Sequence, residues 1–214
     1  MIFKVFFKLK ISGRHHVPAH GGAILASNHA SYSDILLIGC GLKRRLRYVA
    51  KAELFKSFFF RLLWIYLGGI PIKRSGVPLE SFKRIQRETD RGRLIVVFPE
   101  GTRSRDGHLR KPKLGIGMMV ALSKVPVIPV YISGSGQVLA PHSRRIRVHP
   151  VAVSYGPPVP VADLTERLEG KELYEALSAR IMDKIDQLRL EQPEEMNGKK
   201  PAGLLRAASG RKRK

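Results

Sequence analysis

The sequence has 214 residues, and 43% of them are hydrophobic, which is ordinary for one globular domain with a core of its own. Its 39 Lys and Arg residues against 17 Asp and Glu residues give a formal net charge of +22, which favours polyanionic partners such as nucleic acid, an anionic membrane surface or phosphorylated substrates. The single cysteine excludes an internal disulfide, and no apolar run approaches the roughly 18 residues of a transmembrane helix.

Apolar runs with the lengths of strands and of helices alternate along the chain. We expect a first strand that ends near 11–13 and further strands at 22–27, 47–50, 70–72, 94–98 and 127–132. The segment 146–155 should form either a pair of strands or one strand broken at Pro150. Helices are expected to begin at Asp34 and to cover 52–67, 79–89, 115–123 and 164–190. The strand at 94–98 shows no alternation, so it should be buried on both faces. Pro129 should fit its strand only near a sheet edge or a bulge. The alternation predicts an α/β fold around a mixed, largely parallel sheet flanked by helices.

The sequence indicates one domain over residues 1–192, with its motifs concentrated between residues 24 and 134. The composition changes after Pro193, where residues 193–214 carry seven basic and two acidic side chains. This segment is predicted to be a disordered basic tail. The remaining body keeps a net charge of +17, so the domain itself is expected to attract anions.

The predicted helix at 52–67 is apolar almost all the way round, with three consecutive phenylalanines at 58–60. A helix on the surface of a soluble protein would instead show one apolar stripe. Two interpretations stay open: a helix buried in the core, or a helix facing a membrane or an acyl chain. One face of the helix could also pack in the core while another faces the membrane or the acyl chain.

His29 and Asp34 stand at the junction between the strand at 22–27 and the helix that follows it. Five residues along a straight helix would turn the two side chains apart by roughly 140°, so they can meet only if the chain turns between them. In that arrangement Asp34 would accept from imidazole Nδ1–H and leave Nε2 as a base. The alternative is an ordinary structural hydrogen bond, which is the more frequent role of an isolated His–Asp pair.

Three further segments accompany the one at 28–34, in the order 69–74, 98–104 and 125–130, and the third reads Phe-Pro-Glu-Gly-Thr-Arg-Ser. Together the four resemble the motif blocks of the glycerolipid acyltransferases, specifically the 1-acyl-glycerol-3-phosphate (lysophosphatidate) acyltransferases. The resemblance implies a fold like theirs and an O-acyltransferase that makes phosphatidate for phospholipid synthesis. The donor would be a thioester, acyl-CoA or acyl-carrier protein, used as a co-substrate, with no cofactor.

The resemblance assigns His29 as general base and Asp34 as the residue that orients it. It also implies an acceptor-binding set made of Lys51, Arg74, Glu100, Gly101, Thr102 and Arg103. An arginine fork suits phosphate oxygens and a glycine lets backbone approach closely. Pro71 and Lys73 depart from the residues usual in the second block, which leaves the acceptor preference open.

No nucleophilic serine is needed if the acceptor hydroxyl itself attacks the thioester. The segment Ser133-Gly134-Ser135-Gly136 is not a Gly-x-Ser-x-Gly elbow, because Tyr131 replaces the first glycine. A covalent acyl-enzyme is therefore disfavoured. The other histidines lack the spacing of metal ligands, so no metal is expected.

Two alternatives to lysophosphatidate acylation remain at this point. The acceptor could be another lysolipid or glycerol-3-phosphate, or the charge could indicate a basic nucleic-acid-binding protein, although no motif for that is present. For the enzyme, we expect peripheral binding at the cytoplasmic face of an anionic membrane without a spanning helix.

Overall fold

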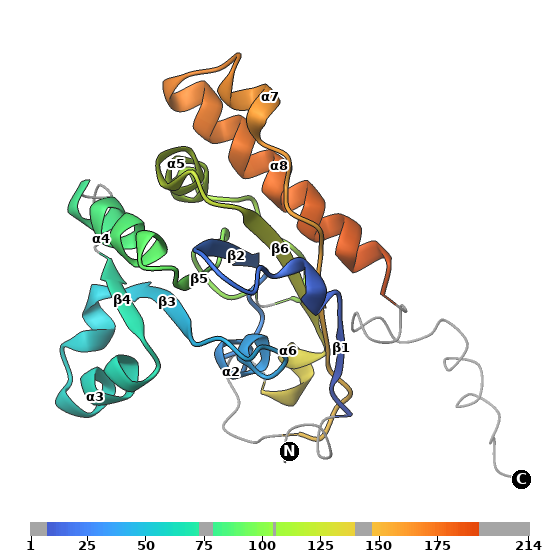
Figure 1. Ribbon diagram of the computed structural model, residues 1–214. Coiled ribbons are helices and arrows are strands. Elements are labelled where there is room, and N and C mark those ends of the chain that lie inside the picture. Colours follow the sequence, from blue (N-terminus) through green and yellow to red (C-terminus); the bar gives the residue numbers. More distant parts are fainter. Residues whose placement is uncertain (1–7, 73–78, 105, 140–146, 193–214) are drawn as a thin grey trace, which may run out of the picture.

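The computed structural model describes residues 8–72, 79–104, 106–139 and 147–192. Their strands form one sheet in the order β1-β7-β6-β2-β5-β3-β4 (Figure 1). The strands are β1 Lys10–Ser12, β2 Ala23–Ser27, β3 Leu46–Lys51, β4 Gly69–Ile72, β5 Leu94–Val97, β6 Val127–Ser133 and β7 Ala152–Tyr155. All pairs are parallel except β6 with β7, as expected for a mixed, largely parallel α/β sheet.

Four neighbouring strands, β2, β5, β3 and β4, run in one direction. Their carboxyl ends therefore lie along the same edge of the sheet, where ligands bind in folds of this kind. β2 and β5 are buried along their whole length, which confirms the prediction for 94–98.

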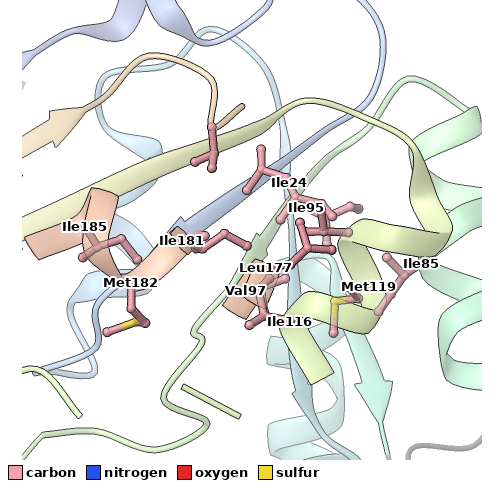
Figure 2. Packing of buried hydrophobic residues seen from close by; sticks show 14 of the residues in the cluster. Ile24, Ile85, Ile95, Val97, Ile116, Met119, Leu177, Ile181, Met182 and Ile185 are labelled. Carbon is pink, nitrogen blue, oxygen red and sulfur yellow. The ribbon is translucent and has the colours of Figure 1, made fainter. Parts of the chain in front are cut away.

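Helices cover both faces of the sheet (Figure 1). They are α2 Asp34–Gly39, α3 Phe58–Tyr66, α4 Leu79–Asp90, α5 Leu114–Ser123, α6 Ser135–Val138, α7 Ala162–Thr165 and α8 Gly170–Leu190, with short 3-10 turns at Arg14–His16 and Ala52–Phe55. Side chains of α4, α5 and α8 pack with alternate residues of β2 and β5 in one cluster, which Figure 2 shows. Residues of α2 and α6 pack in a second cluster on the opposite face.

The spacing of the apolar residues in α8 explains why this helix lies on the sheet. Leu173, Leu177, Ile181 and Ile185 are all buried, and their spacing of four residues forms one apolar stripe. Burying each such side chain stabilises the fold by about 1.5–3 kcal/mol.

Pro129 does not lie in an edge strand, contrary to the expectation, because β6 pairs with β2 on one side and β7 on the other. The ladder with β7 begins one residue later, at Val130 opposite Tyr155. The Pro129 carbonyl accepts from Gly156 N–H at 2.8 Å, so the side of Pro129 that lacks an N–H faces the end of β7. The absent donor therefore interrupts no bond within the β6–β7 ladder.

Three predicted elements have different bounds in the structure. The segment 52–67 is divided into a 3-10 turn and α3, because Ser57 is extended and Phe55 folds back to within 6.0 Å of Trp64, ring centroid to centroid. The segment 164–190 is divided into α7 and α8 where Glu169 is extended and Gly170 has a φ of 54°. Within the described part of 146–155, only Ala152–Tyr155 forms a strand, after Pro150.

The α3 helix is exposed, so the interpretation of it as a core helix is wrong. None of its residues is buried, and the exposed fractions of Phe58, Phe59 and Tyr66 are 78%, 74% and 88%. Trp64 is the side chain that packs toward the core. Among the described residues, no helix combines the length and the apolar character needed to cross a bilayer.

Gly117 sets the distance between α5 and α8. A Cβ at this position would lie 2.0 Å from the Tyr174 carbonyl oxygen, and the Gly117 N–H donates to Ser178 Oγ at 3.1 Å. We therefore expect Gly117→Ala to push the two helices apart and lower the free energy of unfolding by about 1–3 kcal/mol in a denaturant titration.

Gly39→Ala is the matched control, because a Cβ in this helix position would meet its nearest atom at an ordinary 3.6 Å. It should be neutral or stabilise by up to about 1 kcal/mol through helix propensity. Equal effects of the two substitutions would contradict a specific contact between α5 and α8.

Candidate active site

The predicted contact between His29 and Asp34 is present. His29 lies in the loop after β2 and Asp34 is the first residue of α2, and Nδ1 lies 2.8 Å from Oδ2. The backbone N–H groups of Ala30 and Ser31 donate to the same Oδ2 atom, each at 2.8 Å. The chain thus turns around a fully buried carboxylate, which is how two residues five apart can meet.

The hydrogen bonds around Asp34 determine how the imidazole is oriented. An oxygen that accepts from two backbone N–H groups behaves as a carboxylate, so His29 Nδ1 acts as the donor in the third bond. His29 Nε2 has no hydrogen bond to any described residue and is available as a base. The imidazole ring also stacks on Phe98, with ring centroids 3.9 Å apart and planes at 17°, so Phe98 covers one face of the imidazole.

The segment after β5 holds the His29 backbone from both sides. The His29 N–H donates to Glu100 Oε1 at 3.1 Å, and the Ser104 N–H donates to the His29 carbonyl at 2.7 Å. Glu100 is 2% exposed, and its Oε2 accepts from the Arg110 N–H at 3.1 Å. In this structure the Glu100 side chain therefore contacts the backbone of His29 and of Arg110.

Burial raises the pKa of Glu100 from 4.5 to about 7, and the two backbone hydrogen bonds act in the opposite direction. The carboxyl group is thus close to half-ionised near neutral pH.

The Arg103 side chain lies over Tyr32. Its guanidinium carbon is 3.7 Å from the centre of the Tyr32 ring, a cation–π geometry, and Nη2 donates to the Tyr32 hydroxyl at 3.0 Å. Nη1 is buried without a hydrogen-bond partner among the described residues. The fork is thus held by Tyr32 through Nη2, whereas Nη1 is a buried donor that the described residues leave unsatisfied.

The other predicted acceptor-binding residues are spread along the same edge of the sheet. Gly101 has a φ of 67°, a left-handed conformation that favours glycine, and it and Thr102 are exposed. Lys51 is the exposed last residue of β3. Arg74 lies outside the described residues, as does the segment 193–214.

Several contacts of the His29 loop were not predicted from the sequence. Asn28 is buried and pairs with both backbone groups of Ile132 in β6, at 2.8 and 3.0 Å. Ser31 Oγ donates to the Leu139 carbonyl after α6. In the sequence, the position of Asn28 directly after an apolar strand was the one feature that could have indicated these contacts. Among the described residues, no three His, Cys, Asp or Glu side chains gather as a metal site would require.

Comparison with known families identifies the chain. The family model described as "Acyltransferase" matches residues 8–133, more than half of the sequence and the part that contains His29, Asp34 and the segment 98–104. The chain belongs to the acyltransferase family.

Several relatives of the chain share the name 1-acyl-sn-glycerol-3-phosphate acyltransferase. The chain is 29% identical over 147 residues to the chloroplastic 1-acyl-sn-glycerol-3-phosphate acyltransferase LPAT1 of Arabidopsis thaliana, covering 67% of this chain and 41% of that protein. It is 28% identical over 191 residues to a 1-acyl-sn-glycerol-3-phosphate acyltransferase of Bacillus subtilis, covering 84% and 91%. The chain spans less than half the length of several plant relatives that it matches.

The fold of this acyltransferase resembles that of a solved structure. The 1-acyl-sn-glycerophosphate (LPA) acyltransferase PlsC of Thermotoga maritima superposes with a TM-score of 0.66, at 22% identity, over 90% of this chain and 80% of that one. This likeness confirms the predicted fold class, an α/β fold around a mixed, largely parallel sheet.

The raised pKa of Glu100 predicts a specific dependence of stability on pH. In the folded state Glu100 keeps its carboxyl proton up to about pH 7, whereas in the unfolded chain it releases the proton near pH 4.5. The stabilisation that Glu100 gains from its raised pKa is therefore fully present below pH 4.5 and is lost as the pH rises to about 7. Glu100→Gln cannot titrate, and the difference in free energy of unfolding between wild type and variant should therefore fall across this window in urea titrations.

The glutamine also places a donor where Glu100 accepts from backbone N–H groups, so the variant should be less stable by about 1–3 kcal/mol at neutral pH. Glu166→Gln, which removes an exposed carboxylate, is the control. A pH-independent difference between wild type and Glu100→Gln would contradict the raised pKa.

Proposed function

We propose that this chain is a lysophosphatidate acyltransferase, which moves an acyl group from a thioester to the free hydroxyl of 1-acyl-glycerol-3-phosphate. The observation that carries the proposal is the His29–Asp34 pair, held by both backbone groups of His29 to the segment that contains Arg103. The names of the relatives support lysophosphatidate as the acceptor. The donor would be acyl-CoA or acyl-carrier protein.

In the proposed reaction His29 Nε2 removes the proton of the acceptor hydroxyl while its oxygen attacks the thioester carbonyl. The tetrahedral intermediate then breaks its C–S bond, and the imidazolium returns the proton to the departing sulfur. The products are phosphatidate and a free thiol, so no acyl-enzyme forms. Asp34 stabilises the imidazolium, because its carboxylate is already fixed by two backbone N–H groups and needs no reorganisation.

The acceptor phosphate would bind where the carboxyl ends of β5, β3 and β4 meet. Arg103 offers a fork with one unpartnered donor, and Lys51 ends β3. Arg74, two residues beyond the end of β4, is proposed as the third phosphate ligand. Arginine and lysine are the side chains best suited to a phosphate dianion.

We also propose that the enzyme works as a peripheral protein at the cytoplasmic face of an anionic membrane. The exposed aromatic side chains of α3 would enter the interface, with about 25 cal/mol gained for each Å² buried. The net charge of +22 would add an electrostatic attraction that salt screens. The two together would hold the site next to its lipid acceptor.

The dyad is tested by substitution. His29→Ala should lower kcat by at least about 10²–10⁴-fold, the usual contribution of a general base, and Asp34→Asn should reduce it severely but less completely because the imidazole survives in the wrong tautomer. Release of free thiol from acyl-CoA in the presence of lysophosphatidate measures the rate.

His20→Ala, which removes an exposed histidine, is the control and should keep full activity. Near-normal turnover by a folded His29→Ala variant would overturn the mechanism.

The phosphate ligands are tested by comparing the two substrates. Arg103→Ala and Lys51→Ala should each raise the KM for the acceptor by about 10–100-fold, the value of one or two charge-assisted hydrogen bonds, with a much smaller change for the donor. Arg103→Lys should also be impaired, because an ammonium group cannot replace the fork.

Arg110→Ala is the matched control, since Arg110 is an exposed arginine that also follows β5 and its backbone N–H, which the substitution keeps, donates to Glu100. If Arg103→Ala raised the KM values for acceptor and donor equally, a role in phosphate binding would be excluded.

A further inference from the structure

A second concentration of positive charge lies away from the dyad, at the edge strand β4. A cavity of about 340 Å³ opens there between β3, β4 and α4. The residues that line it are Arg47, Gly69, Ile70, Pro71, Arg84, Arg87, Glu88 and Arg91. We call this cavity the arginine pocket.

The sequence of α4 explains why its arginines face one way. Phe82 and Ile85 are buried against the sheet, so Arg84 and Arg87 follow a separate stripe of α4. Arg91, directly after α4, continues this stripe because its N–H still bonds to the Arg87 carbonyl. Arg47 lines the same cavity from β3, so four arginines meet at one cavity beside an edge strand.

The charges that line the arginine pocket are only partly balanced. Glu88 contacts Arg47 at 3.3 Å and Arg91 at 2.9 Å, and it is the one acidic lining residue. The lining set keeps a net charge of +3. Among the described residues Arg84 makes no ion pair, and the one ion pair of Arg87 is with the exposed Glu80, at 4.0 Å. The Arg87 Nε also donates to the Lys83 carbonyl at 3.3 Å. Like charges held this close repel one another, so an anion would stabilise the arrangement.

The arginine pocket is separate from the proposed catalytic centre. The pocket extends along β4 from Gly69 to Pro71, but its arginines come from the start of β3 and from the α4 side. His29 and Glu100 instead follow the ends of β2 and β5, on the other side of β3 from β4. These strands are parallel, and at about 3.3 Å per residue a strand the length of β3 spans roughly 15–20 Å. An anion in the pocket would therefore not be the phosphate of the reacting acceptor.

The position of α3 indicates where that anion would come from. Gly69, in the wall of the pocket, separates the pocket from α3: a Cβ on it would lie 2.8 Å from Trp64 of α3 and 2.9 Å from Phe55 of the preceding 3-10 turn. Trp64 packs with one face of the sheet and α4 with the other, so α3 and the pocket lie on opposite faces of the same edge strand. If the exposed side chains of α3 enter the apolar part of a bilayer, the basic cavity across β4 lies further toward the water, at the depth of the headgroups.

We infer that the arginine pocket binds the phosphate of an anionic phospholipid headgroup while α3 inserts beside it. The guanidinium forks match phosphate oxygens, and the cavity admits a small headgroup. The site would orient the enzyme on the membrane independently of the acceptor. This inference rests on the proposed membrane association, but not on the proposed chemistry of His29.

The test is the binding of the full chain to vesicles of phosphatidylcholine with or without phosphatidylglycerol. The pocket variant carries Arg84→Gln, Arg87→Gln and Arg91→Gln. The control variant carries Arg14→Gln, Arg45→Gln and Arg167→Gln, which are exposed and outside the pocket. Both variants lose three of the 22 net positive charges, so diffuse electrostatic attraction falls equally.

We expect the pocket variant to bind phosphatidylglycerol vesicles at least about ten-fold more weakly than the control variant, with no difference between them on phosphatidylcholine alone. Equal losses in the two variants would show diffuse attraction and overturn the site. Binding is measured without acyl transfer, so a chain that lacked the proposed activity would still give an answer.

Two further arms identify the source of the phosphate and test α3. Inorganic phosphate and CoA, added at concentrations well below those that screen charge, should fail to displace the wild type from phosphatidylglycerol vesicles. Displacement by either would assign the pocket to a soluble anion. Changing Phe58, Phe59 and Tyr66 to Ser should weaken binding to both kinds of vesicle, and unchanged binding would remove the reason to place the pocket at headgroup depth.

Discussion

The site depends on the need to stabilise one buried carboxylate. Asp34 is fully buried, and removing an ion from water costs several kcal/mol unless hydrogen bonds replace the lost hydration. Three donors replace it on Oδ2, and they come from the consecutive residues His29, Ala30 and Ser31, whereas Oδ1 is buried with no hydrogen-bond partner among the described residues. The loop therefore has to wrap around Asp34, and this wrapping places the imidazole at the end of β2 in one tautomer.

The sheet then decides what lies next to the imidazole. β5 pairs with β2 in parallel, so the segment after β5 begins beside the segment after β2. Phe98 stacks on the ring, and Glu100 and Ser104 hold its backbone. Asn28 ties the other side of the loop to β6. The pair proposed to perform the chemistry is thus fixed by two neighbouring strands rather than by the loop alone.

The geometry and apolar pattern of short stretches of sequence were sufficient to predict the contact between His29 and Asp34, because helix geometry over five residues leaves few ways for the two side chains to meet. They were also sufficient for the two-sided burial of β5, whose residues are all apolar. They failed for Pro129, whose neighbours depend on where β7 ends, and for α3, whose composition fits a core or an interface equally well. The partners of Glu100 could not be read from the sequence, because they depend on a register between segments 71 residues apart.

Holding His29 by both its N–H and its C=O has a consequence for how acceptors can be selected. Arg103 belongs to the same short segment as Glu100 and Ser104, so the backbones of His29 and Arg103 are tied together. The guanidinium itself is held over Tyr32, which follows His29 in the same loop. Under the proposed mechanism, in which His29 takes the hydroxyl proton and Arg103 binds the phosphate, the β2–β5 side of the site would limit the distance between these two groups of the acceptor. An acceptor with a larger distance between phosphate and hydroxyl would then require changes on the β3 and β4 side.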